Sequence, residues 1–170
     1  MTISLTEGRL TFGFPADDIA TQYDEWSFYR NQFNSCFGGT KAVDFVYVDA
    51  RALWLIEVKD YRRHARTKIQ DLGEEIAHKV RDTMAGLLAA RANANDADEK
   101  WVARKATAKH LIRVVLHLEQ PVKRSKLFPQ VVDSTKLQLK LRQLLKPVDA
   151  HPRVVNRSSM PHDMRWTVTG

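Results

Sequence analysis

Two runs of residues decide the fold of this chain: Val43-Asp44-Phe45-Val46-Tyr47-Val48 and Leu53-Trp54-Leu55-Ile56-Glu57-Val58-Lys59. Both are rich in β-branched and aromatic residues, and the short polar connection between them predicts a β-hairpin. Side chains alternate along a strand, so a tight turn in the middle of the connection places Asp44 opposite Glu57. Lys59 lies two residues beyond Glu57 and shares its face. Both strands are apolar enough to lie inside a sheet.

The facing carboxylates of Asp44 and Glu57 interrupt two otherwise apolar strands. Cβ atoms of directly opposed residues lie about 4.5–5.5 Å apart, and like charges in that position destabilise a sheet. The two groups stay ionised together only where positive charge lies beside them. A divalent cation between the carboxylates supplies such a charge. The alternative is a surface hairpin on which Glu57 and Lys59 form an ordinary exposed pair.

An aspartate on one strand and Glu-x-Lys on the next resemble the PD-(D/E)xK nuclease superfamily. The matching residues here are Asp44, Glu57, Val58 and Lys59, while Val43 stands where the family has its proline. The resemblance implies metal-dependent hydrolysis of phosphodiester bonds, with Asp44, Glu57 and Lys59 as the catalytic residues. It implies that Asp44, Glu57 and the carbonyl oxygen of Val58 hold Mg²⁺ or Mn²⁺. Lys59 would orient or activate the attacking water.

Members of this superfamily often take one more acidic metal ligand from their first helix. The candidates in this chain are Asp18, Asp24 and Glu25, and Glu25, beside Trp26, is preferred. The alternative is that all three acids are exposed helix charges or caps, which favour the positive end of a helix.

The helix expected after the hairpin carries one polar row, made of Glu75, Lys79 and Asp82. Residues three and four positions apart lie on the same face of a helix. Some members of the superfamily have a lysine or glutamine on this helix, which implies that Lys79 contacts the nucleic acid. The alternative is a solvated face on which neighbouring charges pair.

Positive charge is concentrated directly after the candidate catalytic strand. The net charge of +7 and the isoelectric point near 9.7 favour contact with a polyanion. Each lysine or arginine that neutralises a phosphate adds salt-sensitive affinity. The residues predicted to hold phosphates are therefore those that follow Lys59 most closely: Arg62, Arg63, His64, Arg66 and Lys68. A solvated cationic surface with no specific partner is the alternative.

The expected partner is nucleic acid, with DNA favoured over RNA, and a membrane is not expected. A homodimer or a partner protein stays open. The competing functional hypothesis is a non-catalytic nucleic-acid-binding module, or a subunit of a defence, repair or mobile-element complex that acts only with its partners. In the binding module the acidic residues would be vestigial and the basic surface would bind.

The pattern of elements predicts one α/β domain over residues 1–170, with a mixed central β-sheet flanked by helices and covered on both faces. The resemblance, which covers residues 17–118, implies the restriction-endonuclease-like αβββαβ core. The predicted elements are a bent strand over 3–12, a helix from Pro15 to Cys36, the hairpin, a helix from Ile69 to about Asn93, a helix that Asp96 caps, a strand over 111–118, a helix that Ser134 caps and Pro147 closes, and strands over 153–155 and 166–168.

Composition excludes several other classes of protein. A chain with 44% hydrophobic and 28% charged residues is typical of a soluble globular domain. The lone Cys36 cannot form an intramolecular disulfide and fits a reducing compartment, so a cytoplasmic location is expected. The six histidines show no metal-binding spacing and no cysteine partner, which argues against a zinc site.

Overall fold

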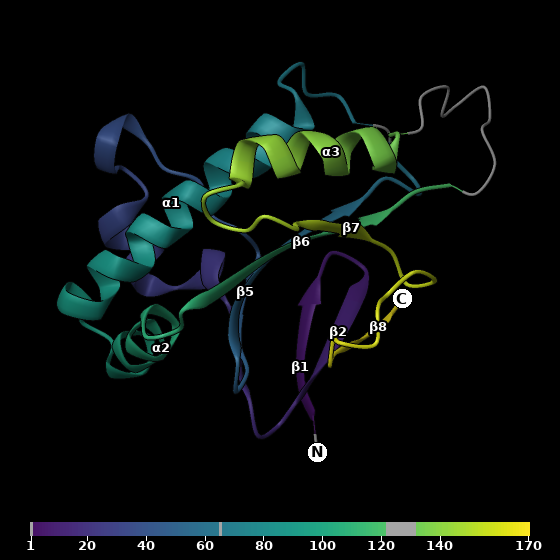
Figure 1. Cartoon of the computed structure of the whole chain (residues 1–170). Coiled ribbons are helices and arrows are strands. Elements are labelled where there is room, and N and C mark those ends of the chain that lie inside the picture. The colour runs from purple at the N-terminus through teal and green to yellow at the C-terminus, as the bar shows by residue number, and fades with distance from the viewer. Residues whose placement is uncertain (1, 65, 122–131) are drawn as a thin grey trace.

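The computed structural model describes residues 2–64, 66–121 and 132–170. Three short helical turns, at Tyr23–Glu25, Tyr29–Phe33 and Cys36–Gly38, lie between the third and fourth strands. The helices and strands labelled in Figure 1 are, in chain order, β1 (Thr2–Glu7), β2 (Leu10–Pro15), β3 (Ile19–Gln22), β4 (Phe45–Val48), β5 (Ala52–Asp60), α1 (Leu72–Asn93), α2 (Ala97–Thr107), β6 (Leu111–Glu119), α3 (Ser134–Leu145), β7 (Arg153–Val155) and β8 (Thr167–Thr169).

The centre of the protein is a five-stranded mixed sheet in the order β3-β4-β5-β6-β7. Strands β3, β4 and β5 are antiparallel neighbours, whereas β5, β6 and β7 run parallel. The mixed α/β class is therefore as predicted. The hairpin register is confirmed too, since Val46 pairs with Leu55 and Tyr47 pairs with Trp54.

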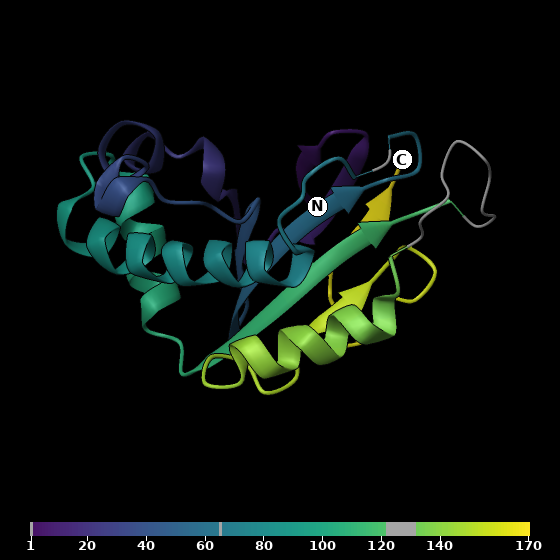
Figure 2. The same cartoon turned by 90° about the horizontal axis from the view of Figure 1, so that it is seen from above.

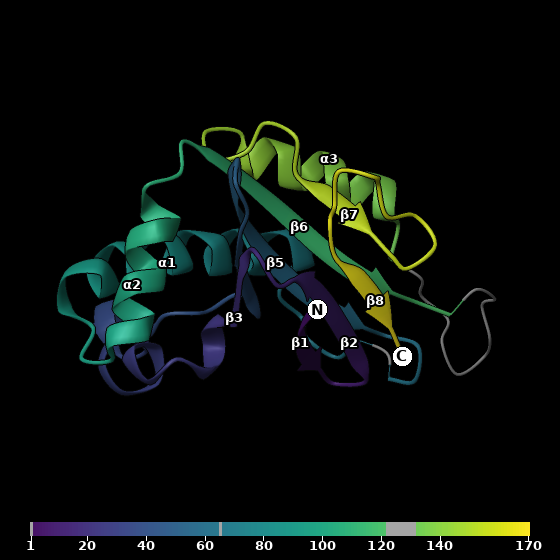
Figure 3. The same cartoon turned by 90° about the horizontal axis from the view of Figure 1, so that it is seen from below.

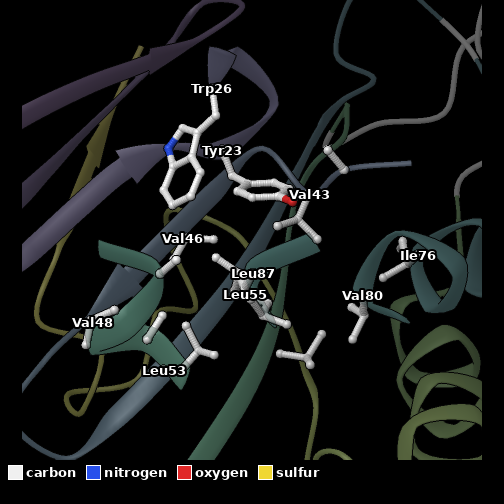
Figure 4. Packing of buried hydrophobic residues seen from close by; sticks show 14 of the residues in the cluster. Tyr23, Trp26, Val43, Val46, Val48, Leu53, Leu55, Ile76, Val80 and Leu87 are labelled. Carbon is white, nitrogen blue, oxygen red and sulfur yellow. The ribbon is translucent and has the colours of Figure 1, made fainter. Parts of the chain in front are cut away.

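The helices α1, α2 and α3 cover one face of this sheet, and the view from above shows α1 and α3 lying across its strands (Figure 2). The strand side chains of this face pack against apolar positions of α1 that recur at helical spacing. Figure 4 shows part of this cluster, including the sheet residues Val46 and Leu55 beside Ile76, Val80 and Leu87 of α1. Burial of this face holds α1 in the orientation that its polar row requires.

The other face is covered by a second, three-stranded sheet in the order β1-β2-β8 (Figure 3). Leu10, Phe12 and Phe14 alternate along β2 and are fully buried against Phe45 and Tyr47 of the central sheet. The central sheet is covered on both faces, as predicted, but helices cover only one of them. The strict two-residue period of the β2 side chains requires a strand.

The predicted helix from Pro15 to Cys36 is wrong. Pro15 ends β2, and the next regular element is β3, which pairs with β4. Tyr23, Trp26 and Phe33 are buried as their spacing suggested, but they belong to short helical turns. Their three- and four-residue spacing also arises in a chain that turns repeatedly around a core, so it did not distinguish the two structures.

The remaining differences concern the ends of elements. The bent strand predicted over 3–12 is a hairpin of β1 and β2, with Gly8 at a positive φ of 58°. The strand that precedes the central hairpin is β3, so the core order is βββαβ without a regular first helix. Asp133 caps α3 in place of Ser134, because its carboxylate accepts from Thr135 and Lys136. Ile69 lies outside α1 and is exposed.

Two further findings concern the helices among the described residues. Asp96 caps α2 as predicted, since its carboxylate accepts from the backbone of Asp98 and Glu99. Within the ranges that the structure describes, no helix combines the length and the apolar character that crossing a bilayer requires.

Gly86 of α1 leads to a stability prediction, because a methyl group there would overlap the hydroxyl of Tyr23 and lie 3.1 Å from Phe33. Gly86→Ala should therefore lower the free energy of unfolding by about 1–3 kcal/mol, the usual cost of overpacking. In an unobstructed helix interior, glycine to alanine instead adds about 1 kcal/mol. Urea unfolding measures the difference.

The matched control for this prediction is the double variant Tyr23→Phe/Gly86→Ala. The Tyr23 hydroxyl is buried and has no hydrogen-bond partner among the described residues, so its removal alone costs little. The double variant should recover most of the stability lost by Gly86→Ala. A single variant more stable than the wild type would show that the described packing is wrong.

Candidate functional site

Asp44 and Glu57 face each other, as the hairpin register requires. Phe45 pairs with Ile56 at the start of β4, and Asp44 comes directly before this strand. The Asp44 side chain is 9% exposed and the Glu57 side chain is 1% exposed. Oδ2 of Asp44 accepts the backbone N–H of Val58 at 2.6 Å, which fixes the carboxylate against β5. The alternative of an exposed hairpin is therefore wrong.

Two lysines accompany these carboxylates. Lys59 Nζ lies 2.6 Å from Oε1 of Glu57, so the three residues of the predicted catalytic set converge. Lys79 Nζ, from α1, lies 2.7 Å from the same Glu57 oxygen and 3.8 Å from Oδ1 of Asp44. Lys79 therefore lies beside both carboxylates, and its predicted contact with nucleic acid stays a prediction.

The polar row of α1 faces the protein interior. Glu75 and Asp82 are buried and Lys79 is partly buried, so the alternative of a solvated face is wrong. Asp82 accepts the N–H of Lys41 at 2.9 Å, and the hydroxyl of the next residue, Thr83, accepts the N–H of Val43 at 3.0 Å. These bonds tie the segment before Asp44 to α1 and thereby hold the aspartate in place.

Further carboxylates approach Asp44 from outside the hairpin. One oxygen each of Glu7, Asp24 and Asp44 lies within 4.8 Å of the other two. Glu25, the preferred helix ligand, is not in this group: its half-exposed carboxylate pairs with Arg30. Asp24, which the sequence analysis ranked lower, takes that position. Glu7 was missed, because it ends a strand of the other sheet and has no spacing relationship to the hairpin.

The acidic group fits a divalent cation by its donors and its charge. Oε2 of Glu57 and Oδ1 of Asp24 are buried and have no hydrogen-bond partner among the described residues. With Glu7 and Asp44, the site holds four carboxylates against two lysines, which leaves two negative charges when all are ionised. Carboxylate oxygens are the ligands that Mg²⁺ and Mn²⁺ prefer. The ligand role that the resemblance implies for the carbonyl oxygen of Val58 stays a prediction.

Burial and mutual repulsion set the protonation of the site. Burial, with the facing Glu57 carboxylate, raises the pKa of Asp44 to about 8, although Lys79 opposes the shift. Burial also raises the pKa of Glu7 and of Asp24. For Lys59, burial acts to lower the pKa, but the adjoining Glu57 carboxylate outweighs it and the pKa is raised. Lys59 is therefore a cation at neutral pH and acts as a hydrogen-bond donor, not as a base.

The basic segment after β5 is partly neutralised by internal carboxylates. Arg62 pairs with Asp60 at 2.7 Å, whereas Arg66 and Lys68 each lie 2.8 Å from the fully buried Glu75. Although burial acts to raise it, hydrogen bonds from Lys68 and Arg66 lower the pKa of Glu75 to about 2. Of the predicted phosphate-binding set, Arg63, His64 and Lys68 lie exposed on the surface.

Comparison with known proteins finds a similar stretch in the cysteine–tRNA ligase of Neisseria meningitidis serogroup A. The identity is 37% over the 164 residues compared. The similar stretch covers 79% of this chain and 24% of the ligase. The chain thus spans about a quarter of the length of the curated relative that it matches. No protein-family model matches the chain, and no solved structure matches it significantly.

The raised pKa of Asp44 predicts how pH affects the stability of the metal-free protein. Between the ordinary pKa of 3.8 and the folded value of about 8, the folded state keeps a proton that the unfolded state releases. The contribution of Asp44 to stability is therefore complete below pH 4 and is lost as pH rises through 8. Asp44→Asn keeps an acceptor for the Val58 N–H and removes the titrating group. As pH rises from 4 to 8, the free energy of unfolding of this variant, minus that of the wild type, should therefore increase by on the order of a few kcal/mol.

Chemical denaturation in EDTA at several pH values measures this difference. Asp17→Asn serves as the control, because the Asp17 side chain is 76% exposed. If the free energies of unfolding of Asp44→Asn and the wild type differ by a constant amount across the pH range, the pKa of Asp44 is not raised in the folded protein.

Proposed function

We propose that this chain is a metal-dependent phosphodiesterase that cuts nucleic acid, with DNA as the favoured substrate. The observation that carries the proposal is the buried, opposed pair of Asp44 and Glu57, with Lys59 Nζ 2.6 Å from Oε1 of Glu57. The other oxygen of Glu57 has no hydrogen-bond partner among the described residues. A chain has little structural reason to bury such a pair, since removing two like charges from water costs several kcal/mol. The single cysteine, Cys36, supports work in the reducing cytoplasm.

Asp44 and Glu57, with Glu7 and Asp24, would hold Mg²⁺ or Mn²⁺. Bound there, the cation would polarise the scissile phosphate and promote ionisation of the attacking water. The predicted ligand role of Glu25 is not retained in this proposal, because its carboxylate pairs with Arg30.

The residues of the chain itself supply orientation and positive charge. Lys59, with 18% of its side chain exposed, reaches from Glu57 toward the surface and would donate to a phosphate oxygen, where negative charge grows in the transition state. Lys79 compensates the inner side of the acidic pair. The Val58 N–H holds one oxygen of Asp44, so the other oxygen keeps a fixed direction.

A non-catalytic nucleic-acid-binding module is the second candidate. The observation in its favour is that Lys59 and Lys79 both lie within 2.7 Å of Oε1 of Glu57, so lysines already neutralise much of the acidic pair. In that case the acidic group would serve stability, and the basic segment would bind alone. Cleavage by the purified protein separates the two candidates.

Substitution of the three central residues tests catalysis. Asp44→Ala, Glu57→Ala and Lys59→Ala should each lower the rate of cleavage in Mn²⁺ by about a hundredfold or more, because Asp44 and Glu57 would hold the cation and Lys59 would donate to the reacting phosphate. Lys59→Ala should keep most of the affinity for nucleic acid, which many cations share. Labelled DNA, RNA and tRNA are the substrates, tRNA because the ligase with the similar segment is named for it.

Lys105→Ala is the control for the lysine variant, because Lys105 is an exposed residue of α2 whose Nζ lies over the Trp101 ring. Full activity in any of the three site variants would remove that residue from the proposed site. A wild type that cuts none of the substrates in Mg²⁺ or Mn²⁺, yet binds them, would favour the binding module.

A further inference from the structure

A pocket of about 230 Å³ opens directly beside the candidate site, where β5 ends. It begins at Lys59, the proposed catalytic lysine, and the segment that leaves β5 forms the rest of its wall. The side chains that the argument uses are Lys59, Tyr61, His64, Arg66, Thr67 and Lys68. The pocket is therefore continuous with the place where a scissile phosphate would lie.

Hydrogen-bond donors dominate the pocket wall. Lys68 gives one hydrogen to Glu75 and keeps two, and its side chain is 61% exposed. The Tyr61 hydroxyl accepts from Arg66 and keeps its own hydrogen to donate. Thr67 and His64 are exposed and add a hydroxyl and an imidazole. The carboxylate on the wall, Asp60, is held by Arg62 at 2.7 Å. Such a wall favours an anion.

The buried carboxylate of Glu75 fixes the positions of the cations in this wall. Its two oxygens accept from Arg66 and Lys68, at 2.8 Å each, and Lys59 Nζ lies 3.9 Å away. Arg66 also donates to the carbonyl oxygen of Gln70 at 2.6 Å, which closes the segment onto the start of α1. One buried carboxylate thus organises several cations and leaves the group with excess positive charge.

The excess can be counted from the ion pairs. Lys59 and Lys79 already face the carboxylates of the acidic group, so the cations that belong to the pocket are Arg66 and Lys68, against the single negative charge of Glu75. One positive charge therefore remains around the pocket, together with the free donors of Lys68, Tyr61, Thr67 and His64. A phosphate monoester carries close to two negative charges at pH 7 and three acceptor oxygens, whereas an internal phosphodiester carries one charge and has one such oxygen fewer. The monoester can therefore use more of the donors in the pocket wall.

We propose that this pocket is a subsite for a phosphate monoester at the end of a nucleic-acid strand. The inference rests on the proposed function, which it deepens: the enzyme would recognise a phosphorylated strand end and cut close to it. Lys68, Tyr61, Thr67 and His64 would donate to the terminal phosphate, and Glu75 is a positioning residue that acts through Arg66 and Lys68.

The test compares one oligonucleotide in three forms, with a 5′-phosphate, a 3′-phosphate or hydroxyl groups at both ends. Fluorescence anisotropy in EDTA measures binding without cleavage. The wild type should bind one phosphorylated form about tenfold more tightly than the hydroxyl form, the effect of one added charge-assisted contact. Lys68→Gln and, separately, the exposed His64→Ala should reduce that preference, whereas Lys105→Gln on α2 should keep it.

Cleavage of the same strands in Mn²⁺ distinguishes failure of the subsite from failure of the proposed function. Equal binding of all three forms would overturn the subsite, whether or not the strands are cut. A preference for one phosphorylated end without any cleavage would support the subsite and overturn the nuclease. Loss of affinity in Lys68→Gln that is equal for all forms would mean that the pocket takes an internal phosphate, which also overturns the proposal.

Discussion

The burial of two opposed carboxylates, Asp44 and Glu57, is the constraint on which the rest of the site depends. Facing across a hairpin, they repel each other, and water reaches neither side chain freely. Three groups beside them reduce this cost: the Val58 N–H, Lys59 from the same strand as Glu57, and Lys79 from α1. Because Oε2 of Glu57 has no hydrogen-bond partner among the described residues, this compensation is incomplete.

The two-sided cover of the central sheet creates this burial. On one face, α1 buries its apolar stripe and, by the same rotation, turns Glu75, Lys79 and Asp82 inward. On the other, β2 packs its aromatic side chains against the hairpin and brings the end of β1, with Glu7, to Asp44. The layers that stabilise the sheet therefore also assemble the acidic group. A loss of packing on either face would separate its members.

Glu75 links the acidic group to the basic segment. It is fully buried, lies 3.9 Å from Lys59 and accepts from both Arg66 and Lys68. Positive charge is thereby held beside Lys59. Lysine and arginine side chains lose rotamer freedom when they are ordered, and the strong hydrogen bonds to a buried carboxylate offset that cost.

The sequence by itself determined the hairpin, its register and the convergence of Asp44, Glu57 and Lys59, because strand alternation and a short turn are local and leave little choice. Local signals also located α1, α2 and β6. Only the tertiary structure decided that β3 replaces the expected first helix, and that Glu7 and Asp24 join Asp44 while Glu25 turns away. The inward orientation of Lys79 belongs to this second group. These positions depend on which apolar faces meet across long stretches of chain, and no periodicity within one segment encodes that choice.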